Sequence, residues 1–142
     1  MKKQLLTIVL AVGVLALIAQ NNRTTLDLLQ SYKWETSIFN DSLLLNYFKV
    51  YTASTFTITE VYVDGDNIVD NYQYYLSDEK EPTFNTSKLG QVQYGKYMMV
   101  KNIKNGEVIC YRILELNDAV FHTIPLRTAF GSGPLKLYAS PK

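Results

Sequence analysis

Tyrosines and carboxylates alternate along residues 55–76, TFTITEVYVDGDNIVDNYQYYL, which is the part of the chain with the most potential for binding chemistry. Because side chains two residues apart lie on the same face of a β-strand, Glu60 and Tyr62 are expected to share one face. Asp70, Tyr72 and Tyr74 are expected to share a face of the next strand. If both faces turn inward in a barrel, they would line a cavity for a ligand with an apolar body and polar edges. Alternatively, these tyrosines cover the outside of a half-solvated sheet.

Two other side chains are candidates for the same cavity. Arg112 lies within the apolar run 107–116, EVICYRILEL, on a face shared with Cys110 and Leu114 that resembles a core face. An inward arginine would need a partner, with Glu60 or Asp70 as the options, because an unpaired buried charge is too costly. Such a pair would either anchor an anionic or carbonyl-bearing ligand or brace the barrel.

Trp34 is the only tryptophan of the chain. It would either close the floor of a ligand cup or plug one end of a barrel. The candidate ligand-binding residues are therefore Trp34, Tyr62, Tyr72, Tyr74 and Arg112.

The sequence contains no recognisable catalytic or metal-binding arrangement. His122 is the only histidine, and Cys110, the only cysteine, lies in a predicted strand without a neighbouring base. One histidine and one distant cysteine are too few for a zinc site. Asp64-Gly65-Asp66-Asn67 is explained by a hairpin turn rather than by a calcium loop. We predict that the protein is not an enzyme and that it has no catalytic residues, metal or cofactor.

Short β-strands separated by turn signals make up most of the chain. Runs of β-branched and aromatic residues predict strands at 31–40, 46–51, 55–63, 67–76, 96–102, 107–116, 119–126 and 135–139. Thr24 or Thr25 could cap a short helical turn before the first strand. Residues 77–86 read as a long loop, with Asp78, Glu79 and Glu81 on a solvated surface. Consecutive hairpins predict an all-β fold, and they favour an antiparallel up-and-down barrel of about eight strands over a sandwich.

The first 20 residues differ in character from the rest. Lys2 and Lys3 precede a mostly apolar run, which predicts a signal peptide at residues 1–20, or an uncleaved anchor, before a single domain at 21–142. Removing this segment leaves 12 Lys and Arg against 13 Asp and Glu, a formal charge of −1. That charge argues against nucleic-acid binding. Export to the periplasm or the extracellular space is expected, or membrane anchoring through the N-terminal segment.

The order of a leader, a short helical turn, a first strand with an early Trp34 and then hairpins resembles the lipocalin-like (calycin-type) small barrels of exported Bacteroides-type bacterial proteins. Lipocalins carry a glycine two residues before this tryptophan, where Tyr32 stands here. A late-strand arginine often packs over the tryptophan in lipocalins, and Arg127 or Arg112 would take that role.

The resemblance implies an eight-stranded lipocalin-like barrel that binds a small, partly apolar ligand without catalysing a reaction. The alternative is a protein-interaction module, such as an exported inhibitor or envelope assembly factor, whose barrel is filled and whose protein partner is bound by the loops at 77–95 and 127–134.

Overall fold

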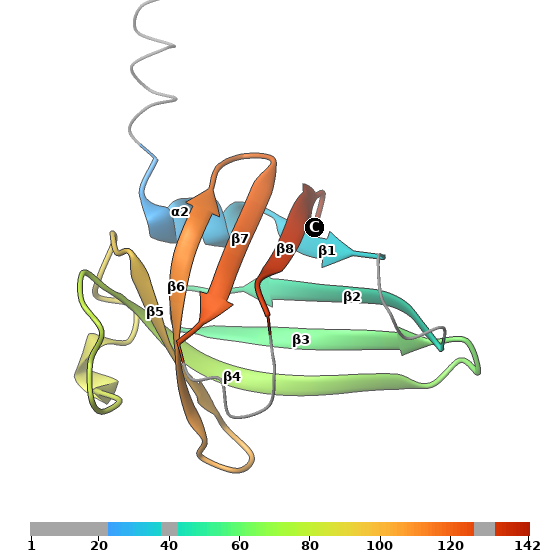
Figure 1. Ribbon diagram of the computed structural model, residues 1–142, viewed down its shortest axis with the longest axis horizontal. Helices are drawn as coiled ribbons and strands as arrows, with labels where there is room; N and C mark the ends of the chain where they lie inside the picture. The colour runs from blue at the N-terminus through green and yellow to red at the C-terminus, as the bar shows by residue number, and fades with distance from the viewer. Residues whose placement is uncertain (1–22, 38–42, 127–132) are drawn as a thin grey trace, which may run out of the picture.

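The computed structural model describes residues 23–37, 43–126 and 133–142, and these residues form a closed antiparallel barrel (Figure 1). A short helix, α2 (Thr25–Ser31), precedes the strands. The strands are β1 (Lys33–Thr36), β2 (Leu44–Tyr51), β3 (Thr55–Tyr62), β4 (Asn67–Ser77), β5 (Tyr97–Asn102), β6 (Val108–Leu116), β7 (Val120–Pro125) and β8 (Leu135–Ser140), with a 3₁₀ turn at Thr86–Lys88.

Every strand pairs with its neighbours in sequence, and β1 pairs with β8 to close the barrel. The prediction of an all-β, antiparallel up-and-down barrel of about eight strands is therefore confirmed. The first strand is shorter than predicted, since Ser31 ends the helix and residues 38–40 lie outside the described part of the chain. The predicted signal segment at 1–20 also lies outside the described residues.

Helix α2 begins with a capping box. The Thr24 side chain accepts a hydrogen bond from the backbone N–H of Asp27, and the Asp27 carboxylate accepts one from the backbone N–H of Thr24. These bonds satisfy backbone donors that the first helical turn leaves unpaired. Leu26 and Leu29 of this helix are buried members of the barrel core. Thr24, one of the two predicted caps, is therefore the N-cap of the helix, which begins at Thr25.

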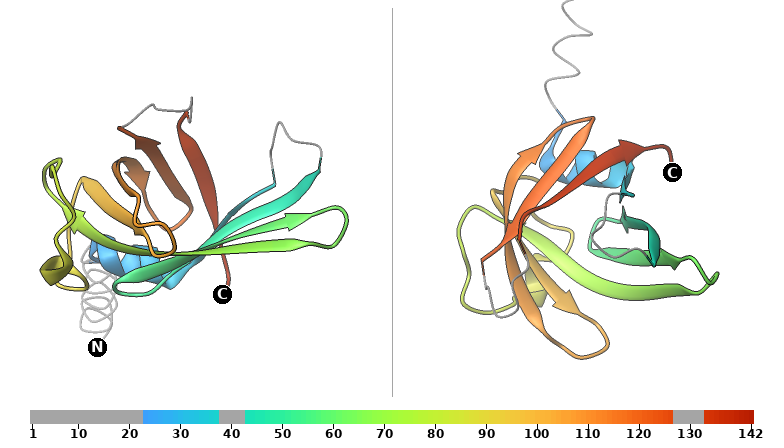
Figure 2. Two further views of the ribbon diagram at one scale, coloured as in Figure 1. Left: turned by 90° about the horizontal axis from the view of Figure 1, so that it is seen from below. Right: turned by 45° about the vertical axis from the view of Figure 1, so that its right-hand side comes forward.

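The β3–β4 hairpin forms as predicted around Asp64-Gly65-Asp66-Asn67. Gly65 has a φ of 90°, a conformation that residues with a side chain rarely adopt. Together with β2, this hairpin extends beyond the other strands of the barrel (Figures 1 and 2). We call residues 43–46 and 60–69 the projecting end.

Aromatic side chains fill much of the barrel interior. Trp34 contacts Phe121 with ring centroids 5.5 Å apart, and Phe121 lies 5.9 Å from Tyr51. Tyr51 stacks on Phe56 at 4.7 Å, and Phe56 stacks on Tyr72 at 4.8 Å. This continuous series of ring contacts connects β1, β7, β2, β3 and β4 across the core, and such contacts stabilise beyond the area they bury.

A second apolar cluster lies on the outer face of β4, β5 and β6. Tyr75, Met99 and Cys110 are buried there against Phe84 and Leu89 of the loop that follows β4. This loop, residues 78–96, therefore covers one outer side of the barrel, so that β6 is apolar on both of its faces.

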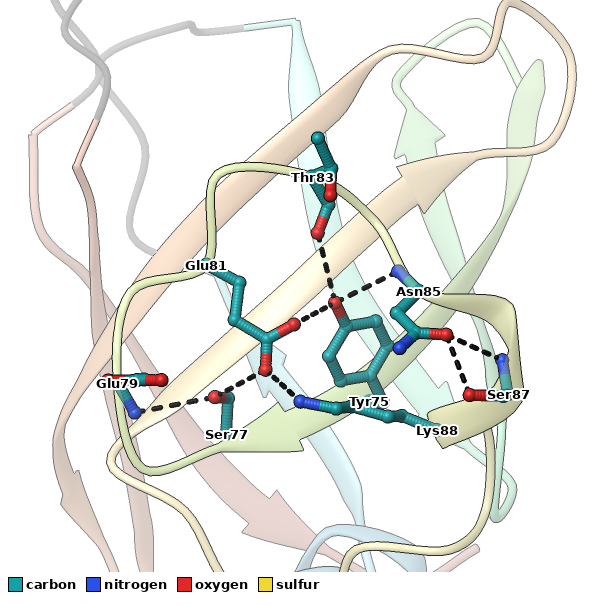
Figure 3. A network of polar contacts seen from close by, with 8 residues as sticks. All are labelled: Tyr75, Ser77, Glu79, Glu81, Thr83, Asn85, Ser87 and Lys88. Carbon is teal, nitrogen blue, oxygen red and sulfur yellow. Dashed lines mark hydrogen bonds and ion pairs between the residues drawn. The ribbon is translucent and has the colours of Figure 1, made fainter.

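Hydrogen bonds to one carboxylate hold this loop in place (Figure 3). Glu81 accepts hydrogen bonds from the Tyr75 hydroxyl at 2.7 Å and the Ser77 hydroxyl at 2.9 Å, and it pairs with the Lys88 ammonium. The backbone N–H of Asn85 donates to the Tyr75 oxygen at 3.0 Å. The prediction that Glu81 belongs to a solvated acidic surface is therefore wrong, because its carboxylate organises the loop.

Candidate functional site

A cavity of about 80 Å³ remains inside the barrel, between the aromatic core and the turn that joins β5 to β6. Side chains from the five strands β2 to β6 and from the turn before β6 enclose it: Lys49, Phe56, Ile58, Tyr72, Val100, Asn102, Glu107, Ile109 and Tyr111. An apolar cavity of about 150 Å³ holds a benzene molecule, so this cavity has room for a few heavy atoms. It is too small to enclose a sterol or a pigment.

Lys49 is the most unusual side chain in the cavity wall. It is paired with Trp34 on β1 and Ile58 on β3, on the inner face of β2, and only 4% of its surface is exposed. Its ammonium forms no ion pair with any side chain in the described part of the chain. Burial alone lowers the pKa of Lys49 to about 8.

Aromatic rings surround the Lys49 ammonium. Its nitrogen lies 5.4 Å from the ring centre of Phe56, 5.7 Å from that of Tyr111 and 5.9 Å from that of Tyr47. Such cation–π contacts contribute about 0.5–2 kcal/mol each, and more when water is excluded. The rings therefore offset part of the desolvation of the charge.

The phenols around the cavity stay protonated over the physiological pH range. Burial, followed by the nearby Asp70 carboxylate, raises the pKa of Tyr72. Burial, followed by the neighbouring Tyr72 and Glu107, raises the pKa of Tyr111. Burial also raises the pKa of Tyr47. These hydroxyls are therefore neutral groups that can donate hydrogen bonds to a ligand.

Two further tyrosines of the interior, Tyr74 and Tyr51, differ in whether their hydroxyls form a hydrogen bond. Tyr74 donates to the backbone oxygen of Thr52 at 2.6 Å. Tyr51 is 1% exposed, and its hydroxyl has no hydrogen-bond partner within the described ranges. The Tyr51 hydroxyl is close enough to Tyr47 and Tyr111 for those groups to affect its pKa, which burial raises.

Polar and acidic side chains form the rim of the cavity. The backbone N–H of Asn102 donates to the backbone oxygen of Glu107 at 2.9 Å, which closes the β5–β6 turn at the cavity edge. The side chain of Glu107 is exposed. Asp70 and Glu60 lie on the inner face of the β3–β4 hairpin, close enough to Tyr72 to affect its pKa. The cavity is thus basic on its inner wall and acidic at its rim.

The structure separates the predicted ligand-binding residues. Tyr72 lines the cavity. Tyr74 lies deeper, bonded to Thr52, and Tyr62 lies on the projecting end, where its hydroxyl donates to Glu60 at 2.7 Å. Trp34 is fully buried, and its indole N–H donates to the Leu29 oxygen at 3.1 Å. This position corresponds to the predicted plug rather than to a residue of the cavity wall.

The prediction that Arg112 points inward is wrong. Tyr111 faces the cavity, and Arg112, the next residue of β6, is exposed on the outer face opposite Tyr97. The face that Arg112 shares with Cys110 is apolar because residues 78–96 cover part of it, not because it belongs to the barrel interior. Within the described ranges, Glu60 and Asp70 therefore have no buried arginine to pair with. Arg127, the other candidate, lies outside the described residues.

Most residues of the cavity wall were not among the predicted ligand-binding residues, and Lys49 and Tyr111 are two polar ones on the inner strand faces. Lys49 and Tyr111 alternate with outward-facing neighbours in NYFKVY and ICYRI, and their position in the wall is visible only from the strand register. The signal that could have found Lys49 is its place between Tyr47 and Tyr51, since a lysine in phase with two tyrosines on a strand shares their face.

Other hollows of the surface are shallower or lie outside the barrel. A cleft of about 390 Å³ lies between the loop at 78–96 and β5–β6, beside Lys80, Met99, Cys110 and Leu126. Among the described residues, no three His, Cys, Asp or Glu side chains are close enough together to hold a metal ion. The helices within those ranges are all too short or too polar to span a membrane.

Comparison of the chain with protein-family models, with curated proteins and with solved structures gave no match. The lipocalin-like family therefore stays a prediction, and the geometry of the cavity carries the argument about function.

Proposed function

We propose that this protein is an exported, non-enzymatic, lipocalin-like binding protein that holds a small, partly apolar ligand inside its barrel. The observation that carries the proposal is the interior cavity, in which a buried amine and phenol hydroxyls face apolar side chains. Small-molecule sites typically combine apolar walls with a few polar groups that orient the ligand. Tyr72 and Tyr111 supply hydroxyls to this cavity, while Ile58, Val100 and Ile109 supply apolar surface.

Native mass spectrometry of the full chain, purified gently from the organism that makes it, tests this proposal. We expect a bound small molecule that is lost on denaturation. Ile109→Phe, which adds a ring to the cavity wall, should lower the bound fraction, whereas Ile103→Phe on an exposed turn should not. Equal occupancy in both variants would place the ligand elsewhere, and an empty wild-type protein would favour the second candidate below.

The second candidate function is protein interaction, favoured by the apolar surface of the projecting end. Five large apolar side chains there are about half exposed: Leu43, Leu45, Val63, Ile68 and Val69. The backbone N–H of Val63 donates to the oxygen of Leu43 at 2.9 Å, so these two residues lie side by side just beyond the paired ends of β3 and β2. Gathered apolar side chains on a protein surface often mark an interaction site.

A photo-crosslinker placed at residue 63 tests the second candidate in the organism that makes the protein. We expect a crosslink to one protein from position 63 and none from position 138, which is similarly exposed on β8. Crosslinking of the same protein from both positions would argue against a specific surface at the projecting end.

A further inference from the structure

Lys49 lies in the cavity wall without a counterion within the described ranges. A ligand that supplies a negative charge would therefore be favoured. The two ion pairs found within those ranges, Lys33–Glu35 and Lys88–Glu81, both lie outside the barrel interior. A buried charge normally has a partner, because removing it from water without one costs several kcal/mol. The cation–π contacts of Lys49 compensate for only part of this cost.

None of the acidic groups near the cavity forms an ion pair with Lys49 within the described ranges. Glu60 accepts a hydrogen bond from Tyr62 at 2.7 Å, and Glu107 is exposed at the rim. Asp70 pairs with Ile58 across the β3–β4 ladder, near the phenol of Tyr72. No carboxylate of the described residues lies within 4.0 Å of the Lys49 nitrogen.

A second buried polar group in the same interior also lacks a partner. The Tyr51 hydroxyl is unbonded within the described ranges, and it lies within electrostatic range of Tyr111 in the cavity wall. An unsatisfied buried hydroxyl costs about 1–3 kcal/mol. An unpaired cation and an unpaired hydroxyl in one interior both favour a ligand that brings acceptor oxygens.

We propose that the cavity binds a small organic monocarboxylate, whose carboxylate pairs with the Lys49 ammonium and whose short apolar chain packs on Ile58, Val100 and Ile109. This inference rests on the proposed ligand-binding function and names the ligand class. Glu107 and Asp70 near the rim disfavour a second negative charge on the ligand. The volume of about 80 Å³ restricts the buried part to a few heavy atoms.

Butyrate, butyramide and succinate test the class because they have similar sizes and differ in charge. Titration calorimetry on the full chain at pH 7 should detect butyrate, with affinity for butyramide and succinate lower by about tenfold or more, the difference that one charge-assisted hydrogen bond supplies. Lys49→Met and Lys49→Gln should lose the preference for butyrate over butyramide. Lys136→Met, on the exposed outer face of β8, should keep it.

Proton uptake gives a second readout that general packing of a ligand would not produce. Pairing with a carboxylate raises the pKa of Lys49, so butyrate binding at pH 8 should take up a fraction of a proton. The phenols of Tyr47, Tyr51, Tyr72 and Tyr111 remain protonated, because burial raises their pKa values, and they contribute nothing at this pH. Calorimetry in buffers of different ionisation enthalpy measures the uptake, which Lys49→Met should abolish.

The outcomes separate this inference from the function on which it rests. Equal affinity of the wild type for butyrate and butyramide, or butyrate binding without proton uptake, would show that the ligand is not recognised through a carboxylate. Either result would still agree with the proposed ligand-binding function. Absence of binding by all three compounds, together with an empty protein in native mass spectrometry, would overturn both. Should the Lys49 variants fail to fold, the ratio of butyrate to butyramide affinity in the wild type still decides the question.

Discussion

At the scale of single residues, Lys49 has the largest expected effect on both stability and ligand binding. Its side chain crosses an aromatic interior to a cavity, with 4% of its surface exposed and no counterion among the described residues. An apolar side chain at this position would remove the desolvation cost of the charge. The charged Lys49 therefore lowers the stability of the barrel. Such a loss of stability is expected where a residue is kept for binding.

Lys49→Met should increase stability near neutral pH. Above pH 10.5 the amine is neutral in both the folded and the unfolded chain, so burial carries no charge penalty. As the pH falls from 10.5 toward 8, the unfolded chain takes up the proton first, and the wild type loses stability. The full penalty of up to about 3 kcal/mol then persists below pH 8.

Urea unfolding of the wild type and Lys49→Met between pH 7 and pH 10 measures this effect. The advantage of the variant should narrow as the pH rises, while Lys136→Met should show no such trend because Lys136 is exposed on β8. An advantage that does not change with pH would mean that Lys49 has the same pKa in the folded and the unfolded chain, so that burial does not penalise its charge.

Tyr51 and Tyr74 form a matched pair of buried phenols with opposite expected responses. Tyr74→Phe removes a 2.6 Å hydrogen bond to Thr52 and should lower the free energy of unfolding by about 1 kcal/mol. Tyr51→Phe removes a hydroxyl that has no partner in the described part of the chain, so stability should stay the same or rise by about 1 kcal/mol. Equal losses in the two variants, measured by urea unfolding, would show that the Tyr51 hydroxyl is bonded in solution.

The sequence predicts which residues of a strand share a face, but not always which face is inside. The faces of Ile58 with Glu60 and of Tyr72 with Tyr74 turn inward, which is one of the two alternatives that the sequence left open. On β6 the same reasoning fails for Arg112, because both faces of this strand are apolar. Periodicity cannot distinguish a core face from an outer face that a distant loop covers.

At the scale of elements, local chemistry explains why the strand boundaries are predictable. Asp64-Gly65 and Asn105-Gly106 provide the positive φ angles that tight connections need, at Gly65 and Gly106. The loop at residues 78–96, which we call the cover, lies on the outer side of the barrel, and this position is not predictable from local sequence. Its position depends on tertiary contacts of Tyr75, Met99 and Cys110, and on a carboxylate that looks solvated in the sequence.

Glu81→Gln should loosen this cover. Burial raises the pKa of Glu81, but its bonds to Lys88, Tyr75 and Ser77 outweigh burial, so that the pKa lies below its usual value. The carboxylate therefore stabilises the fold above about pH 4.5, and this contribution is lost as the pH falls further. Loss of the charged partner should lower the free energy of unfolding by about 1–2 kcal/mol at pH 7.

The thiol of Cys110 reports on the same loop because it is the only cysteine and is buried beneath the cover. Its reaction with a maleimide should be faster in Glu81→Gln than in the wild type at pH 7. Glu79→Gln serves as the control, since Glu79 is exposed in the same loop. Equal reaction rates in all three proteins would show that the Glu81 network does not hold the loop down.

At the scale of the whole molecule, the inner cluster and the outer cluster share the strands β4, β5 and β6. Tyr74 and Tyr75 are adjacent in β4, yet Tyr74 belongs to the barrel interior and Tyr75 to the outer cluster. Helix α2 is also connected to this assembly, since the backbone N–H of Leu26 donates to the Gln93 oxygen at 3.1 Å. No described element therefore packs independently of the barrel.

This sharing predicts that the barrel unfolds as one cooperative unit. Trp34 is the only tryptophan, and it lies in β1, which pairs with β8 where the barrel closes. Its fluorescence therefore reports on the closure, while far-ultraviolet circular dichroism reports on all strands. The two signals should follow one urea transition with the same midpoint, as expected for a small two-state domain. A fluorescence midpoint at lower urea would instead mean that the β1–β8 pairing opens before the rest of the barrel, and that the closure is the least stable part of the fold.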